Sequence, residues 1–225
     1  MTYNTFVRFR TMFVAEEPAT VPEDFYSVFS HFIGDILRGF DLEGEPYTFS
    51  LRLSPGVRYA EGTFEGVRFI LMRFSSGEDD VFNAVIDAVV RLKDRWEGIR
   101  VGSGNFRVGD ITVDPPVRIK GSFVTLSPVV VESEGRFLMP DDPDFAPALE
   151  GSVRRRMGVL TGSKPSYLTV KVEEYTEAEV PSLRGKVKGF VGRIKVRADK
   201  ATLNFLYEYG MGSRTADGFG MLEVD

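Results

Sequence analysis

Apolar and polar positions in the first half of the chain recur with the periods of helices and strands. Apolar residues three and four apart predict a helix over 22–39, which Gly39 ends. Ser76 is a potential cap for a second helix, which is expected to turn Trp96 inward. Period-two alternation and short apolar runs predict strands at 5–13, 47–52, 57–60, 66–74 and 99–113. The first half is therefore β-α-β-β-α-β in outline.

The same order of elements recurs in the second half. Asp114-Pro115-Pro116 is the best linker candidate, because two prolines interrupt both helix and sheet hydrogen bonding. Apolar residues at four-residue intervals predict a helix over 141–159, and a shorter helix is expected over 199–209. Strands are predicted at 121–133, 167–174, 187–197 and 219–224.

The repeated order predicts an α+β chain of two tandem ferredoxin-like (βαββαβ) domains, residues 1–114 and 117–225. A chain of 225 residues is long enough to give each domain a core of its own. The absence of cysteine excludes disulfide frameworks and thiolate zinc sites, and a single histidine excludes multi-histidine metal centres. No stretch resembles a membrane span or a signal peptide, so we expect a cytoplasmic protein with no membrane partner.

Positive charge is concentrated in one stretch of an otherwise acidic chain. The formal net charge is −5, yet residues 151–200 contain 12 Lys and Arg against 5 Asp and Glu. This asymmetry predicts a polyanion-binding face, although a solvated helix or strand surface explains it equally well. Alternate residues of a strand lie roughly 6.5–7 Å apart on one face, so cations there can follow a nucleic-acid backbone. The cations expected to bind RNA are Arg184, Lys186, Lys188, Arg193, Lys195 and Arg197.

A glycine-rich loop, GMGSRTADGFG at 210–220, lies between the last predicted helix and the last strand. Glycine permits positive φ and lets backbone N–H groups approach a phosphate, although a tight connection is the simpler explanation of such a loop. Neither a Walker sequence nor a dinucleotide fingerprint is present. Phe219 can stack on a base or anchor the loop in the core. The loop residues expected to contact RNA are Gly210, Gly212, Ser213, Arg214, Gly218, Phe219 and Gly220.

The pattern YEYGMGSRTADGFGMLEV resembles the glycine-rich signature of the repeat-associated RNA-binding superfamily of CRISPR systems, and most closely its repeat-processing endoribonucleases, the sixth Cas family. SFVTLSPVVV at 122–131 resembles the strand that opens the second domain in that family. Val21-Pro22 before an aromatic helix, with PYTFS at 46–50, is a weaker match. The resemblance spans nearly the whole chain.

The resemblance implies two ferredoxin-like domains and a nuclease that cuts CRISPR precursor RNA within each repeat without a metal or another cofactor. In that family the 2′-OH beside the scissile bond attacks the phosphate and leaves a 2′,3′-cyclic phosphate. The implied partner is CRISPR repeat RNA. Other subunits of an interference complex, and a second copy of the chain in a homodimer, are left open as further partners.

His31 is the only histidine and therefore the candidate for proton transfer. Helical periodicity places it about 140° from the centre of the apolar face, so it is expected to be exposed. Asp35, one turn further on, is positioned to orient the ring or raise the pKa of His31. A surface histidine without a role is the alternative. Tyr26 is the second catalytic candidate, able to hydrogen-bond the nucleophile or to pack at the domain boundary.

The sequence departs from the family pattern at one point. Many relatives carry the catalytic histidine just after the first helix, with a lysine shortly beyond, whereas FDLEGE at 40–45 contains neither residue. Other branches place the histidine within the helix, which keeps His31 admissible. The departure keeps a second function open, a non-catalytic repeat-RNA-binding or structural subunit of an interference complex. A third function, that of an unrelated small-molecule-binding or scaffold protein, is also left open.

Overall fold

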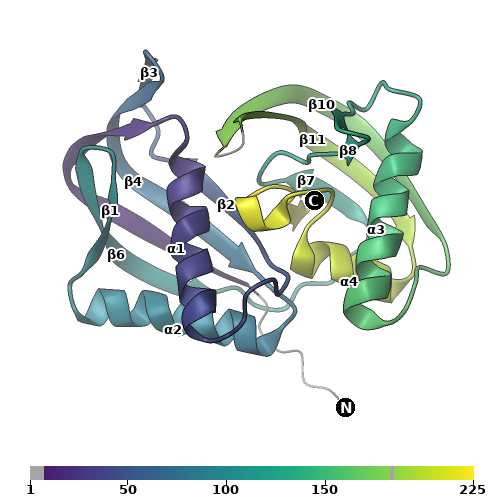
Figure 1. Ribbon diagram of the computed structural model, residues 1–225, viewed down its shortest axis with the longest axis horizontal. Helices are drawn as coiled ribbons and strands as arrows, with labels where there is room; N and C mark the ends of the chain where they lie inside the picture. Colours follow the sequence, from purple (N-terminus) through teal and green to yellow (C-terminus); the bar gives the residue numbers. More distant parts are fainter. Residues whose placement is uncertain (1–7, 183–184) are drawn as a thin grey trace.

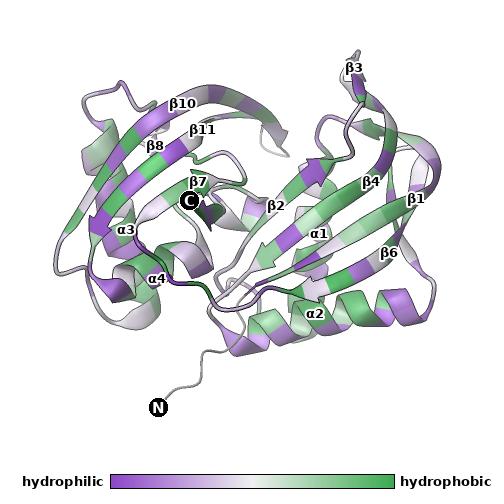
Figure 2. Cartoon of the chain, turned by 180° about the vertical axis from the view of Figure 1, so that it is seen from behind, coloured by the Kyte–Doolittle hydropathy of each residue, from purple (hydrophilic) through white to green (hydrophobic). Residues whose placement is uncertain are grey.

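Two antiparallel sheets lie side by side in the computed structural model, which describes residues 8–182 and 185–225 (Figure 1). Each sheet carries its helices on one face. Viewed from behind, the other faces of both sheets are turned to the same side (Figure 2). The molecule therefore has a helical side and a sheet side.

The first sheet has the strand order β2-β4-β1-β6-β5, with β3 paired to β4. Its strands are β1 (Arg8–Pro22), β2 (Thr48–Leu53), β3 (Arg58–Ala60), β4 (Thr63–Ser75), β5 (Gly98–Val101) and β6 (Gly104–Val113). Helices α1 (Phe25–Gly39) and α2 (Asp79–Asp94) belong to this half. The antiparallel run β2-β4-β1-β6 is the ferredoxin-like arrangement expected from the order of the elements.

The second sheet repeats this arrangement in the order β10-β11-β7-β12. Its elements are β7 (Ser122–Thr125), the hairpin β8 (Glu132–Ser133) and β9 (Arg136–Phe137), α3 (Phe145–Thr161), β10 (Leu168–Ser182), β11 (Gly185–Ala198), α4 (Lys200–Tyr209), the 3-10 turn η1 (Thr215–Asp217) and β12 (Leu222–Val224). The tandem ferredoxin-like fold is thus confirmed. The first sheet ends at Val113 and the second begins at Ser122. The division of the chain into domains of residues 1–114 and 117–225 stays a prediction.

The core of the first half forms where the apolar stripe of α1 meets the inward side chains of β1. Phe29 and Ile33 are fully buried, as their three- and four-residue spacing predicted. The Phe13 and Phe29 rings meet edge to face with their centroids 5.1 Å apart. This packing fixes the orientation of α1, and therefore of the polar residues on its other side.

Three sequence expectations about the elements are wrong. Trp96 is 76% exposed rather than inward, because α2 ends at Asp94 and Trp96 adopts a left-handed φ of 56°. Ser76 accepts a hydrogen bond from the N–H of Glu78 at 3.1 Å, so it precedes the helix instead of capping it. The strand expected at 121–133 stops at Thr125, and Val129 returns to the sheet only as an isolated bridge to Phe190.

Candidate functional site

The glycine-rich loop is packed between the two sheets. Thr48 of β2 donates a hydrogen bond to the carbonyl of Phe219 at 3.0 Å. A Cβ added at Gly218, where φ is 91°, would lie 2.5 Å from Tyr26 Cδ1 and 2.8 Å from Phe49. Glycine is therefore required there by close contact with the first half of the chain. For this part of the loop, the structure shows the simpler of the two explanations, a tight connection.

Most backbone N–H groups of the loop bond to protein carbonyls. Met211 donates to Gly220 at 2.8 Å, and Ser213 donates to Val130 at 2.7 Å. Further bonds of this kind are made by the N–H groups of Gly210, Gly218 and Gly220 to Leu206, Thr215 and Pro128. The expectation that these glycine N–H groups approach a phosphate is therefore wrong, because their hydrogen bonds are already made within the protein.

Arg156 of α3 holds the loop from its other side. Its guanidinium donates to the carbonyls of Tyr209, Gly210 and Gly212 at 3.0–3.2 Å. Burial lowers the pKa of Arg156 to about 10. Backbone groups of the loop are thus bonded to the protein on both sides of the loop, which ties it to the boundary between the halves.

Two side chains of the loop have different surroundings: Phe219 is buried in the core, and Arg214 forms an ion pair. Phe219 is 1% exposed, and its ring lies parallel to that of Tyr26 with centroids 6.3 Å apart. Of its two expected roles, the structure shows the core anchor and not the base stack. Arg214 donates from Nε to Glu132 at 3.0 Å, so its charge is paired.

Helix α1 carries both catalytic candidates, and the structure separates them. His31 is exposed, as expected. Tyr26 is buried, and its hydroxyl both donates to the carbonyl and accepts from the N–H of Leu51 at 3.0 Å. Burial raises the pKa of Tyr26 to about 12. Because the Tyr26 hydroxyl is enclosed and fully bonded, it cannot contact a substrate, and the expectation of a catalytic Tyr26 is wrong.

Asp35 is engaged away from His31. Its carboxylate pairs with Arg38 at 2.9 Å, and Arg38 in turn pairs with Glu43 at 2.6 Å. Among the residues that the structure describes, no hydrogen bond or ion pair involves the His31 ring. The expected orientation of His31 by Asp35 is therefore not observed.

A cleft of about 350 Å³ opens between the two halves beside the loop. Tyr47 and its neighbours line one wall, Arg155 and Val159 of α3 line another, and Ala216 of the loop lies between them. The carbonyl of Ala216 also accepts a hydrogen bond from Ser30, at 3.1 Å. The loop therefore touches both this cleft and the turn of α1 that carries His31. The cleft was missed at the sequence level because its walls come from three distant segments.

The exposed cations of β11 are partly neutralised by acidic residues beside them. Lys186 pairs with Glu179 at 2.7 Å, and Lys195 pairs with Glu173 at 2.6 Å. Arg193 pairs at 2.6 Å with Asp225, the last residue. Lys188 and Arg197 are exposed and have no ion pair within the described part of the chain. Arg184 lies outside the described residues. Three of the expected RNA-binding cations thus have acidic partners in the structure, and their contact with RNA stays a prediction.

The second half of the chain, which contains the glycine-rich loop and α3, matches a known protein family. Residues 113–224 match the family model "CRISPR associated protein Cas6, C-terminal". The chain belongs to the Cas6 family. A CRISPR-associated endoribonuclease-like protein, Cas6nc, of Pyrococcus horikoshii is 25% identical to this Cas6-family chain over 170 residues, 69% of this chain and 68% of that protein.

Solved structures share the fold over the whole length of the Cas6-family chain. A Cas6-related protein from Pyrococcus furiosus has a TM-score of 0.83 at 20% identity, covering 97% of this chain and 98% of the other. A RAMP protein that binds different RNA substrates has a TM-score of 0.80 at 21% identity, covering 97% and 99%. Among the described residues, no helix has both the length and the apolar character needed to cross a bilayer.

Proposed function

We propose that this Cas6-family protein binds CRISPR repeat RNA and cuts it within the repeat. The 2′-oxygen beside the scissile bond attacks phosphorus, the bond from phosphorus to the 5′-oxygen breaks, and a 2′,3′-cyclic phosphate remains. The observation that carries the proposal is the exposed His31 on the turn of α1 whose Ser30 is bonded to the glycine-rich loop.

Proton transfer is the chemistry that His31 brings to this reaction. An imidazole titrates near neutral pH, so it can take the 2′-OH proton or protonate the leaving 5′-oxygen. Such general acid-base catalysis contributes about 10²–10⁴-fold in rate. Arg155, which lines the neighbouring cleft and is exposed, is a source of positive charge for the phosphate in the transition state. The reaction needs only two proton transfers: the 2′-OH loses a proton, and the leaving 5′-oxygen gains one.

RNA as the ligand has support from proteins of the same fold. A Cas6 product complex has a TM-score of 0.66 to this chain at 15% identity. The RAMP protein that binds different RNA substrates shares the fold more closely. These likenesses favour a nucleic-acid ligand over a small molecule or a purely scaffolding role.

A second candidate function is repeat-RNA binding without cleavage, as a subunit of an interference complex. The surroundings of His31 favour it. Asp35 and Glu43 both form ion pairs with the nearby Arg38. The Tyr26 hydroxyl is buried. His31 therefore has no second proton-transfer group bonded to it among the described residues.

One experiment separates the two candidates. Purified protein is incubated in EDTA with CRISPR repeat RNA and with the same RNA carrying one 2′-deoxy nucleotide at the cut site. The proposal predicts cutting of the first RNA only, and at least a 100-fold slower reaction for His31→Ala with unchanged RNA affinity. Asn83→Ala, an exposed polar position on α2, is the matched control and retains full activity. Binding without cutting establishes the second candidate, and absence of both contradicts the two together.

A further inference from the structure

The cleft between the two halves has the size of a site for one nucleotide. We call it the loop cleft; residues 44–47, residues of α3 between 155 and 160, and residues 215–216 form its walls. Its volume of about 350 Å³ lies at the lower end of the range for ligand sites, about 300–1,000 Å³. Because Ala216 in its wall is bonded to Ser30, the loop cleft lies beside the turn of α1 that carries His31.

Tyr47 presents a buried hydroxyl group to the loop cleft. The residue is 6% exposed, and its ring stacks on that of Phe74 with centroids 5.6 Å apart, which fixes its position. Within the part of the chain that the structure describes, the Tyr47 hydroxyl forms no hydrogen bond. Burial raises the pKa of Tyr47 to about 12, with Asp217 adding to the shift, so the hydroxyl keeps its proton. Since buried donors are normally satisfied, this hydroxyl indicates a ligand in the cleft.

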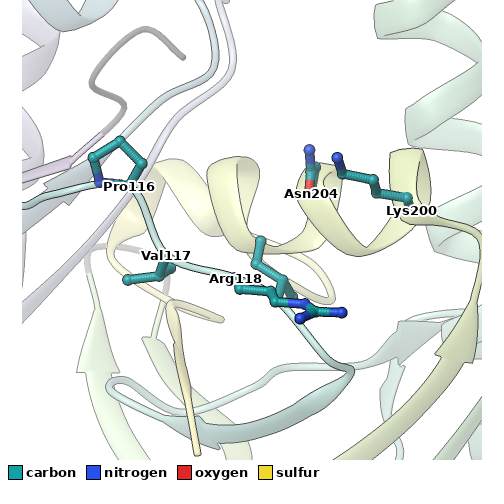
Figure 3. Close-up of a pocket in the computed structure, with 6 residues that line it drawn as sticks. Pro116, Val117, Arg118, Lys200 and Asn204 are labelled. Atoms are coloured by element: carbon teal, nitrogen blue, oxygen red, sulfur yellow. The ribbon is translucent and has the colours of Figure 1, made fainter.

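A larger cleft of the molecule offers no such group. It has a volume of about 650 Å³ and lies between the linker and α4, where Figure 3 shows its lining side chains. None of its six lining residues is buried. The loop cleft is therefore distinguished by a buried and fixed hydrogen-bonding group, and not by its size.

Helix α3 brings an apolar side chain and a cation to the loop cleft. Val159 is 83% exposed although it is aliphatic, and it gains from any apolar surface that covers it. Arg155 lies one turn earlier on the same side of α3, is exposed, and forms no ion pair with a described residue. The α3 wall thus suits a ligand with an apolar face and a neighbouring negative charge, as a nucleotide has.

Glu45 favours a base over a phosphate inside the loop cleft. Its carboxylate is exposed and has neither a hydrogen bond nor an ion pair among the described residues. A carboxylate repels a phosphate and only accepts hydrogen bonds. Pro46 restricts Glu45 to an extended backbone, in which residues two positions apart face the same side, so Glu45 and Tyr47 line one cleft. A ligand that meets both groups needs N–H donors for Glu45 and an acceptor for Tyr47.

We propose that the loop cleft binds a guanine base, that of a nucleotide next to the scissile phosphate, and that Glu45 and Tyr47 determine this specificity. The inference rests on the proposed function, because it names the base that is read beside the same site. The Watson–Crick edge of guanine places two adjacent donors, N1–H and the N2 amino group, beside the O6 acceptor. Glu45 accepts from both donors, and the Tyr47 hydroxyl donates to O6.

The other bases satisfy this pair of side chains less well. Adenine and cytosine each place one amino group beside a ring nitrogen that is an acceptor, and uracil has one N–H between two acceptors. Each of them therefore offers Glu45 a single donor and sets an acceptor against its carboxylate. A site whose polar groups are left unpaired by the wrong base discriminates against that base.

The test uses repeat RNAs with guanosine, inosine or 2-aminopurine at each of the two positions that flank the cut site. Inosine lacks only the N2 amino group of guanosine, and 2-aminopurine lacks O6 and N1–H. Cleavage is measured in single turnovers at protein concentrations below saturation. At one of the two positions we expect the wild type to cut the guanosine RNA at least about tenfold faster than the inosine RNA, because a hydrogen bond to a charged group is lost.

Two variants should change different ratios of these rates. Glu45→Ala is expected to bring the guanosine-to-inosine ratio to about 1, because no carboxylate remains to accept from N2. Tyr47→Phe should leave that ratio unchanged and lower the guanosine-to-2-aminopurine ratio about three- to tenfold, because the donor to O6 is lost. A general loss of structure would slow all three RNAs alike. Glu61→Ala and Tyr167→Phe, at exposed positions outside the cleft, are the matched controls and keep both ratios.

Each outcome decides a different part of the inference. Equal rates of the wild type on guanosine and inosine RNAs at both positions overturn the guanine site and leave the proposed function intact. A guanosine preference that persists in Glu45→Ala overturns the assignment to the loop cleft. If the wild type binds the RNAs without cutting them, their dissociation constants give the same ratios and decide the inference separately from cleavage. Failure to bind any repeat RNA overturns the proposed function and this inference together.

Discussion

The Ser30 hydroxyl donates a 3.1 Å hydrogen bond to the carbonyl of Ala216 and so joins α1 to the glycine-rich loop. The two residues are 186 positions apart in sequence. This bond holds one turn of α1 against the second half of the chain. His31 lies on that turn. If His31 transfers the proton as proposed, Ser30 is a positioning residue, one that acts on the reaction through the placement of His31.

Ser30→Ala removes this bond and is expected to slow repeat cleavage three- to tenfold, equivalent to about 0.5–1.5 kcal/mol for one hydrogen bond. RNA affinity should stay unchanged. Ser30→Thr keeps a hydroxyl and should restore the rate, measured as single-turnover cleavage at saturating protein. Equal rates for the alanine and threonine variants, both below the wild type, would show that the bond itself is not responsible.

Gly218→Ala tests the close packing of the loop. The added Cβ would meet Tyr26 and Phe49 at 2.5–2.8 Å, in a backbone conformation with positive φ. We expect the free energy of unfolding to fall by about 2–4 kcal/mol, measured by denaturant titration. Gly135→Ala is the matched control, because Gly135 has a φ of 74° and no atom near the added Cβ. It should cost only about 1 kcal/mol, and equal losses for the two variants would rule out the steric explanation.

Arg8 joins β1 to the second half. It is 2% exposed, and its guanidinium donates to the carbonyls of Leu222 and Tyr207 and lies over the Tyr207 ring. Burial lowers the pKa of Arg8 to about 10. Arg8→Ala leaves these carbonyls without their donor and is expected to cost about 3–5 kcal/mol of stability in urea unfolding. Arg10→Ala, an exposed position whose pairing with Asp114 spans 3.6 Å, should cost less than about 1 kcal/mol.

Glu208 predicts a pH dependence of stability. Burial raises the pKa of this carboxyl from 4.5 to about 7, with Glu78 adding to the shift and Arg8 opposing it. The folded state therefore holds a proton that the unfolded state releases, and stability falls as the pH rises from about 4.5 to about 7. Glu208→Gln should remove most of this decline, worth about 2 kcal/mol, in melting curves between pH 4.5 and 8. Glu61→Gln, at an exposed position, should keep it, and an unchanged decline in Glu208→Gln would contradict the assignment.

Periodicity was sufficient to predict the fold, because each element carries its own apolar pattern. The stripe of α1 and the alternation of β11 both bury the residues that their spacing indicated, among them Phe29 and Ile194. The position of α2's end was less predictable, because the left-handed conformation of Trp96 leaves no periodic signal. What the pattern cannot encode is which element lies opposite another.

Several of the misread site residues depend on such long-range pairing. Phe219 and Tyr26 are 193 positions apart by their numbers, and only the folded chain shows that each covers the other. Lys195 looked free in its own strand, but it pairs with Glu173 of the adjacent β10. His31 was placed correctly because its exposure follows from the polar face of a single helix. Local patterns thus predicted local exposure, and contacts between distant segments determined which charges remain available.

The most direct test of the central claim is the chemistry of the RNA ends. Repeat RNA is incubated with the protein in EDTA, and the new 3′ end of the upstream fragment is analysed by mass spectrometry. The proposed 2′-OH attack predicts a 2′,3′-cyclic phosphate on that fragment, formed by the wild type and lost in His31→Ala. A 3′-hydroxyl end, or repeat RNA that binds tightly and stays intact, would contradict it.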